Sequence, residues 1–252
     1  MSAEGPAPAL SIVVPVYNEE GNVAALHAEL TEVARGLGQP YEIVFVNDGS
    51  RDTTLDRLSA IAADDPNLRI VDLDGNFGEA AALSAGFAHA RGHVVVTLDG
   101  DGQNDPHDIP GMLAHLDQWD AVTGWRTNRA AGDSWVRRLS SRIANRIRNR
   151  LSDESIQDSG CTFRAFRREC LRDLVLYRGF HRFIPTLLKM RGFRVLEVPV
   201  NHRPRRFGQS KYGIGNRALR AFVDLLVVRW MKDRLLRYEV AENVGGDGGV
   251  ER

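Results

Sequence analysis

Several features of secreted and membrane-spanning proteins are missing from this 252-residue chain. Its two cysteines, Cys161 and Cys170, form neither a CxxC pair nor a disulfide framework, so we expect free structural thiols in a reducing compartment. We expect no secretory leader at the start of the sequence, and no uncharged apolar run reaches the roughly 18 residues that a bilayer span requires. These absences predict a cytoplasmic protein.

Signatures of several function classes are also missing. No G-x-G-x-x-G follows the first apolar run, which disfavours a dinucleotide-binding fold. The chain has no internal repeat and no nucleic-acid-binding motif, so nucleic acid is not an expected partner. Five histidines lack the spacing of metal ligands, and we interpret them as structural or surface residues: His89, His93, His107, His181 and His202.

The net charge of zero conceals an uneven distribution of charge. Residues 1–120 carry 20 acidic and 5 basic side chains, a net charge of −15, whereas residues 121–252 carry 13 acidic and 28 basic ones, a net charge of +15. A basic half indicates an anionic partner, such as phosphates or a lipid surface. Within it, residues 126–150 hold eight arginines and one acid. Apolar Trp135, Leu139, Ile143 and Ile147 recur every four residues, and this spacing predicts an amphipathic helix whose basic face is either solvated or in contact with an anion or a membrane.

Short apolar runs alternate with segments of helical periodicity. The apolar runs predict strands over residues 10–16, 41–46, 68–73, 93–97 and 120–126, and a later edge strand over 192–200. The helical spacing predicts helices over residues 23–36, 55–61 and 79–90, and from about 215 to 238. This alternation predicts an α/β fold with a Rossmann-like, mostly parallel sheet that helices cover on both faces.

Polar loops recur at one end of the predicted strands, at residues 17–19, 48–50 and 99–103. In open α/β sheets, ligands bind beyond the carboxyl ends of the strands. Asp99 and Asp101 follow a buried strand at i and i+2, and two carboxylates so close repel each other unless a cation neutralises them. Such oxygen ligands suit Mg²⁺. The alternative is a solvated Asp/Gly turn.

Seven stretches in order resemble the family 2 glycosyltransferases of the GT-A fold, and most closely their dolichyl-phosphate mannosyltransferase-like, or polyprenyl-phosphate glycosyltransferase, branch. The stretches are residues 14–20, 46–50, 76–78, 98–103, 124–126, 158–164 and 206–212. The resemblance implies a GT-A domain over residues 10–213 and a C-terminal amphipathic helical extension over 214–240, which either packs on the domain or lies in the lipid headgroup region. We predict disordered tails over 1–9 and 241–252.

The resemblance also implies a nucleotide-sugar site. Asp99 and Asp101 would hold Mg²⁺ or Mn²⁺, with Asp101 coordinating it across the diphosphate, and Gln103 would contact the donor sugar or phosphate. Asp48 would accept hydrogen bonds from the base, or cap its own turn, or do both. The other residues implied for the donor are Pro15, Tyr17, Glu19, Val46 and Lys211.

For the acceptor, the resemblance places Arg126 near its phosphate, together with Arg164 and Ser141. Asp158 would lie near the reacting centre, or alternatively cap the turn at Ser159. Residues 201–213 form a cationic loop with glycine hinges that can close on the diphosphate, so that Arg206 and Lys211 stabilise the leaving nucleotide. The implied catalytic residues are Asp99, Asp101, Gln103, Arg126, Asp158 and Arg206.

We therefore expect a metal-dependent, inverting hexosyltransferase of the cell envelope. It would move a mannose- or glucose-type unit from a nucleotide diphosphate sugar to a dolichyl or undecaprenyl phosphate, while peripherally bound to the inner face of the membrane. The acceptor phosphate is mostly ionised at neutral pH, since its second pKa is about 6, and needs no histidine base. Two alternatives stay open: a glycan or small-molecule acceptor, and a non-catalytic nucleotide-sugar-binding protein of the membrane surface. The sequence indicates no oligomeric state.

Overall fold

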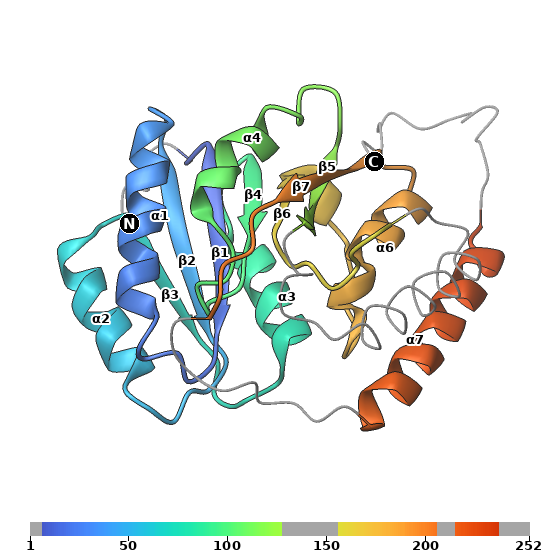
Figure 1. Ribbon diagram of the computed structural model, residues 1–252, viewed down its shortest axis with the longest axis horizontal. Coiled ribbons are helices and arrows are strands. Elements are labelled where there is room, and N and C mark those ends of the chain that lie inside the picture. The colour runs from blue at the N-terminus through green and yellow to red at the C-terminus, as the bar shows by residue number, and fades with distance from the viewer. Residues whose placement is uncertain (1–6, 128–155, 206–214, 237–252) are drawn as a thin grey trace, which may run out of the picture.

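A mixed β-sheet forms the centre of the computed structural model, which describes residues 7–127, 156–205 and 215–236 (Figure 1). Within these residues the strand order is β3-β2-β1-β4-β6-β5-β7. Neighbours pair in parallel, except that β6 runs antiparallel to β4 and β5. The strands are β1 (Leu10–Val16), β2 (Tyr41–Asn47), β3 (Leu68–Asp72), β4 (Val94–Thr97), β5 (Ala121–Arg126), β6 (Arg164–Arg167) and β7 (Val195–Val200). The predicted α/β fold with a mostly parallel sheet is confirmed.

Helices cover both faces of the sheet, because alternate residues of its apolar strands point to opposite sides. Ile12 and Val14 of β1 pack on one face with α1 (Val23–Gly36), α2 (Thr54–Asp64) and α4 (Ile109–Leu113). Val13 packs on the other face with α3 (Glu79–His89) and α6 (Ile184–Met190). The predicted helices in the first 90 residues are confirmed to within a turn.

The sequence analysis missed β6 and α6. β6 is only four residues long and begins and ends with arginine, so it lacks the apolar run that marks its neighbours. Ala165 and Phe166 nevertheless pack on opposite faces of the sheet. β7 lies at the sheet edge, as predicted for the strand that contains Pro199.

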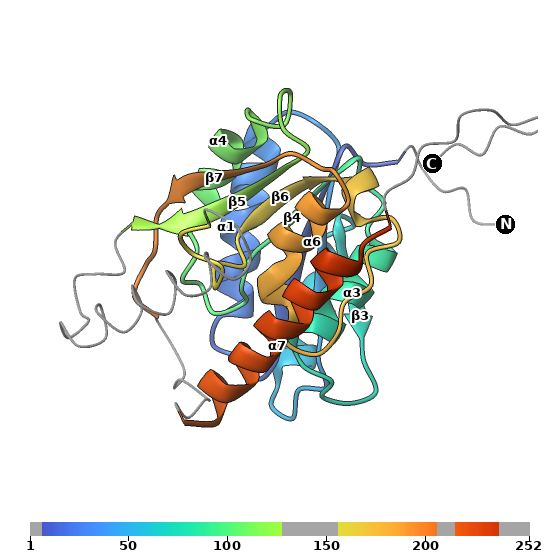
Figure 2. The same ribbon diagram turned by 90° about the vertical axis from the view of Figure 1, so that its right-hand side faces the viewer.

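The C-terminal helix α7 (Gly215–Arg234) lies beside α6 (Figure 2). Its Leu225 and Val228 are buried against Phe180, Phe183 and Leu187. Residues 235–236 are not helical, so α7 ends before the predicted limit near residue 238. In the parts of the chain that the structure covers, no helix is long and apolar enough to cross a membrane.

Some predictions fall outside the described residues. These are the basic helix over 126–150 from residue 128 onward, Ser141, Arg206, Lys211 and the tail over 241–252, whereas Arg126 itself ends β5. The tail predicted over residues 1–9 is too long at its inner end. Ala9 donates its N–H to the Pro40 carbonyl over 2.8 Å and accepts from the Val94 N–H over 3.0 Å, so it belongs to the folded domain.

Candidate active site

Asp48 follows β2 and holds the loop that leads into α3. Its Oδ1 accepts from the Phe77 N–H at 2.8 Å, and its Oδ2 accepts from the Gly78 N–H at 2.9 Å and from Asn76 Nδ2 at 3.0 Å. The carboxylate is buried, and the Asp48 N–H donates to the Val16 carbonyl at the end of β1. Asp48 thus ties together three chain segments, and its contact with a nucleotide base stays a prediction.

The loop after β1 is fastened to the loop after β2. The Asn18 N–H donates to Ser50 Oγ and the Glu19 N–H to Thr54 Oγ1, each over 2.9 Å. Pro15 near the end of β1 and Tyr17 on this loop are half-buried, and their contact with the donor stays a prediction. Val46, another residue predicted to bind the donor, has a fully buried side chain on the α3 face, so only its backbone is placed for such a contact.

The acidic turn after β4 lies against the end of β1. Gly100 permits this approach, since a Cβ there would come within 2.6 Å of Val16 Cγ1. Asp101 is buried, and its Oδ1 accepts from the Gln103 N–H at 3.0 Å. The Asp99 N–H donates to Asn104 Oδ1, also at 3.0 Å. Val16 therefore contacts both the Asp48 segment and the acidic turn.

The carboxylate of Asp99 lies close enough to that of Asp101 to be affected by its charge. Burial and the negative charge of Asp101 raise the pKa of the Asp99 carboxyl above its usual value, although Arg126 and Arg164 oppose the rise. A cation would relieve this repulsion. Among the described residues, no group of three or more His, Cys, Asp and Glu could hold an ion by itself. An ion held by Asp99 and Asp101 would therefore need further ligands, such as the diphosphate oxygens and water that Mg²⁺ commonly binds.

A segment from the basic half crosses this turn. The Arg203 N–H donates to the Gln103 carbonyl at 2.8 Å, and His202 and Asn104 form an isolated β-bridge. The Gln103 amide, predicted to contact the donor, donates to the Arg203 carbonyl at 3.3 Å. At the end of this segment, Arg205 Nη2 binds Asp101 Oδ2 at 2.6 Å. The sequence analysis selected Arg206 and not Arg205, because the stretch that resembles the family begins at residue 206.

Arg126 and Asp158 form a bidentate ion pair. Arg126 Nε lies 2.6 Å from Asp158 Oδ2, and Nη2 lies 2.9 Å from Oδ1. Burial opposes the charged guanidinium, but the pair with Asp158 outweighs it and raises the pKa of Arg126. The Asp158 N–H in turn donates to Glu197 Oε1 of β7 at 2.9 Å. Residues predicted separately, for the acceptor and for the reacting centre, are thus brought together and bind each other.

Arg164 begins β6 and is fully buried. Its Nη1 donates to the His181 carbonyl at 2.7 Å and its Nη2 to the Ser159 carbonyl at 3.4 Å. Burial lowers its pKa, although nearby acids such as Glu79 and Asp99 oppose the shift. The buried Nε of Arg164 has no hydrogen-bond partner among the described residues, and the contact of Arg164 with the acceptor phosphate stays a prediction.

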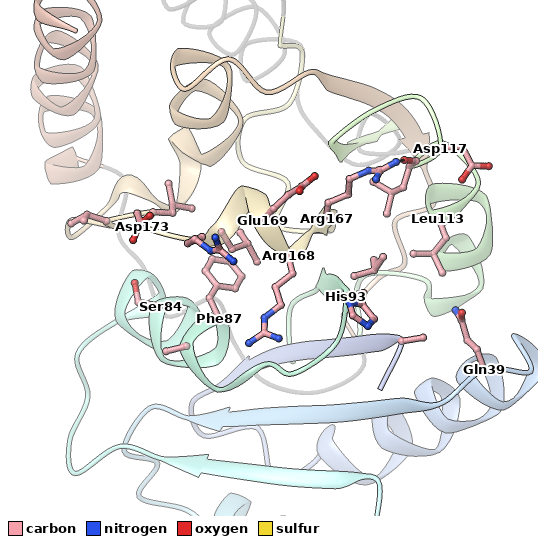
Figure 3. Close-up of a pocket in the computed structure, with 18 residues that line it drawn as sticks. Gln39, Ser84, Phe87, His93, Leu113, Asp117, Arg167, Arg168, Glu169 and Asp173 are labelled. Carbon is pink, nitrogen blue, oxygen red and sulfur yellow. Dashed lines mark hydrogen bonds between the residues drawn. The ribbon is translucent and has the colours of Figure 1, made fainter. Parts of the chain in front are cut away.

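A hollow of about 1110 Å³ lies at the other end of the sheet, where β1 and β4 begin (Figure 3). Arg167 on its wall donates to the Leu116 carbonyl, and Arg168 donates to the Arg91 carbonyl. The arginines and acids that line it are equal in number: Arg167, Arg168 and Arg172 against Asp117, Glu169 and Asp173. This hollow is remote from the acidic turn and is not part of the candidate site.

Residues 11–175 match the family model described as glycosyl transferase family 2. A curated relative, dodecaprenyl-phosphate galacturonate synthase from Rhizobium johnstonii, is 38% identical over 224 residues. The alignment covers 87% of this chain and 66% of that protein, so the chain spans just under two thirds of the relative's length.

Solved structures share the fold. Glucosyl-3-phosphoglycerate synthase from Mycobacterium tuberculosis, in complex with Mn²⁺, uridine-diphosphate and phosphoglyceric acid, aligns with a TM-score of 0.66 and 21% identity, over 88% of this chain and 78% of its own. A mannosyltransferase from Pyrobaculum calidifontis, in complex with GDP-Man and Mn²⁺, aligns with a TM-score of 0.59 and 20% identity, over 90% of this chain and 64% of its own. The chain belongs to glycosyltransferase family 2 and has the GT-A fold.

Proposed function

We propose that this protein transfers a hexosyl unit from a nucleotide diphosphate sugar to a polyprenyl phosphate at a membrane surface. The observation that carries the proposal is the meeting of opposite charges beyond the carboxyl ends of the strands. The acidic turn of Asp99 and Asp101 comes from the first half of the chain, and Arg126 and Arg205 come from the second. The curated relative, named for a polyprenyl phosphate acceptor, supports the lipid class.

The donor would bind across the loops that Asp48 holds in place, with its diphosphate toward the acidic turn. Asp99 and Asp101 would hold Mg²⁺ or Mn²⁺, which offsets the charge of a diphosphate leaving group. Arginine side chains at the same edge add fixed positive charge where negative charge develops. Metal complexes of the GT-A neighbours are consistent with this assignment.

The acceptor would be its own nucleophile. A lipid phosphate is mostly ionised at neutral pH, because its second pKa is about 6. A single in-line displacement by such an oxygen inverts the anomeric carbon. Arg126, held in orientation by Asp158, would place the phosphate, so Asp158 acts on the acceptor through the guanidinium rather than as a base.

The proposed association with a membrane surface rests on α7. Its outer face exposes Val223, Leu226, Val227 and Trp230, while Leu225 and Val228 pack inward. Exposed basic residues, Arg229 and Arg234, lie along the same helix. Apolar side chains flanked by cations are typical of a helix that lies in the headgroup region of an anionic membrane. We propose peripheral association with the cytoplasmic face on this basis.

A transfer assay with a panel of donors and acceptors tests the proposal. The donors are UDP- and GDP-linked glucose, mannose and galacturonate, the last because of the relative's name. With Mn²⁺ and a short polyprenyl phosphate, we expect one donor to give a lipid-linked sugar, and we expect Asp101→Asn to give none while retaining its fold by circular dichroism. Transfer to a glycan or phosphoglycerate but never to lipid phosphate would replace the lipid acceptor by a soluble one. Nucleotide-sugar binding without transfer to any acceptor would favour the non-catalytic alternative.

A further inference from the structure

We propose that Arg205 takes the place of the metal ion in the free protein. Its guanidinium binds the Asp101 carboxylate and is displaced when the cation and the nucleotide diphosphate bind. The inference deepens the proposed function and takes from it only that Asp101 is a cation ligand. The contact between Arg205 and Asp101 lies between two described residues.

Both oxygens of Asp101 are engaged. Oδ1 accepts from the Gln103 N–H at 3.0 Å, within the turn itself. Oδ2 binds Arg205 Nη2 at 2.6 Å, which is a charge-assisted hydrogen bond between two largely buried side chains. A divalent ion that used Oδ2 would have to break this pair. Arg205 and the ion therefore compete for one oxygen atom.

The segment that carries Arg205 is anchored independently of that pair. Arg203 binds Glu29 and Asp105 through its guanidinium and Gln103 through its backbone. The Asn201 N–H donates to Asp108 Oδ2 at 2.6 Å. When the Arg205 side chain leaves Asp101, these contacts keep the backbone beside the acidic turn. The guanidinium then stays within reach of a bound diphosphate.

The exchange also keeps the site close to electrical balance. Arg205 faces Asp101, with Glu19 and Asp99 close enough to favour its charge. Without a guanidinium or a metal ion, these acids would repel one another across a poorly solvated turn. With the ion bound, the displaced arginine can pair with the negative nucleotide. Cation and nucleotide binding are therefore coupled through Arg205.

Calorimetric titration of Mn²⁺ into the nucleotide-free protein tests the competition. Because Arg205→Gln frees Oδ2, we expect it to bind Mn²⁺ about tenfold more tightly than the wild type, the scale of one charge-assisted hydrogen bond. Arg205→Lys keeps the charge without the planar fork and should bind Mn²⁺ with intermediate affinity. At saturating Mn²⁺, Arg205→Gln should bind a nucleoside diphosphate about tenfold more weakly than the wild type, since the diphosphate loses the guanidinium that would pair with it.

Arg51→Gln is the matched control, because it removes the same charge from an exposed position at the same end of the sheet. We expect its Mn²⁺ affinity to stay within about twofold of the wild type, as exposed charges are screened.

The proposal is overturned if Arg205→Gln binds Mn²⁺ no more tightly than the wild type, or no more tightly than Arg51→Gln. It is also overturned if Asp101→Asn binds Mn²⁺ as well as the wild type does. If Arg205→Gln does not fold, an unchanged affinity in Arg205→Lys overturns it. None of these titrations contains an acceptor, so a failure of the proposed lipid transfer is detected separately.

Discussion

At the scale of single residues, the site is built by side chains that satisfy several loops at once. The Asp48 carboxylate accepts three hydrogen bonds from residues 76–78, and the Arg126 guanidinium donates two to Asp158. The sequence predicted that Asp48, Asp99 and Asp101 would lie beyond the strand ends, because polar residues follow apolar runs there. It could not predict the pairing of Arg126 with Asp158, since 32 residues separate them and each matched a different motif.

Asp48→Asn tests the role of that carboxylate. An amide group would face the Phe77 and Gly78 N–H groups and the Asn76 side chain, and could accept at only one of its two atoms. We expect the free energy of unfolding to fall by about 2–3 kcal/mol, the penalty for unsatisfied buried donors. Urea denaturation measures it, with the exposed Asp74→Asn as control. A change as small as that of the control would show that the loop does not depend on the carboxylate.

Gly49→Ala tests the close approach of two loops. Gly49 has φ +65°, and a Cβ there would lie 2.4 Å from the Gly75 carbonyl carbon. Gly38 has nearly the same φ, +67°, but open space around it. We expect Gly38→Ala to cost about 1 kcal/mol for its backbone conformation, and Gly49→Ala to cost at least about 2 kcal/mol more because the backbone must move. Equal thermal stabilities of the two variants would contradict this contact.

At the scale of elements, β1 to β4 were predictable because a buried parallel strand is a continuous apolar run. β6 was not, because its four residues include Arg164 and Arg167, which make their hydrogen bonds with carbonyls that only the folded chain supplies. The segment 201–205 was recognised as cationic, but its pairing with residues 103–105 is a long-range contact that periodicity cannot reveal.

Glu42 links three neighbouring elements of the sheet and predicts a pH dependence. It accepts from Ser11 Oγ of β1, from Arg69 of β3 and from Arg91 before β4. Burial alone would raise the pKa of Glu42, but these hydrogen bonds outweigh it and hold the pKa below its usual value. A lowered pKa stabilises the fold above the unfolded-state pKa of about 4.3, and this contribution is lost as the pH falls through the folded-state pKa.

We therefore expect Glu42→Gln to be less stable than the wild type at pH 7, by about 2–4 kcal/mol, because Arg69 and Arg91 lose their buried partner. Below about pH 4.3 the difference should shrink, as the wild-type carboxyl also becomes neutral. Denaturation curves between pH 7 and pH 3 measure it. A difference that stays constant over this range would show that ionisation of Glu42 does not stabilise the sheet.

The two faces of α7 predict opposite effects of substitution. Trp230 is 61% exposed and Val228 is 1% exposed. Trp230→Ala should leave the free energy of unfolding unchanged and weaken binding to vesicles that contain anionic phospholipid by about tenfold. Val228→Ala should lower that free energy by about 1–3 kcal/mol and leave vesicle binding intact. Co-sedimentation decides between them, and equal vesicle binding by Trp230→Ala and the wild type would exclude this face as the membrane contact.

At the scale of the whole molecule, the acidic and the basic halves of the sequence meet at the turn of Asp99 and Asp101. The acidic first half supplies β1 to β4 and the turn of Asp99 and Asp101, and the basic second half supplies β5 to β7 and returns across that turn through residues 201–205. The antiparallel strand β6 makes this return possible, since it inserts between β4 and β5 and brings the later chain beside the earlier one. Under the proposed function, the acidic half would hold the cation and the basic half would face the diphosphate at the same site.

Calorimetry of UDP and GDP binding, with Mn²⁺ and after chelation, tests the central claim most directly. The account predicts that the wild type binds one of the two nucleotides in a metal-dependent way, with an affinity that falls at least about tenfold on chelation. Asp101→Asn should bind it weakly under both conditions. Equal affinity of the wild type with and without Mn²⁺, or metal-dependent binding that survives in Asp101→Asn, would contradict an acidic turn that holds the sugar diphosphate through a cation.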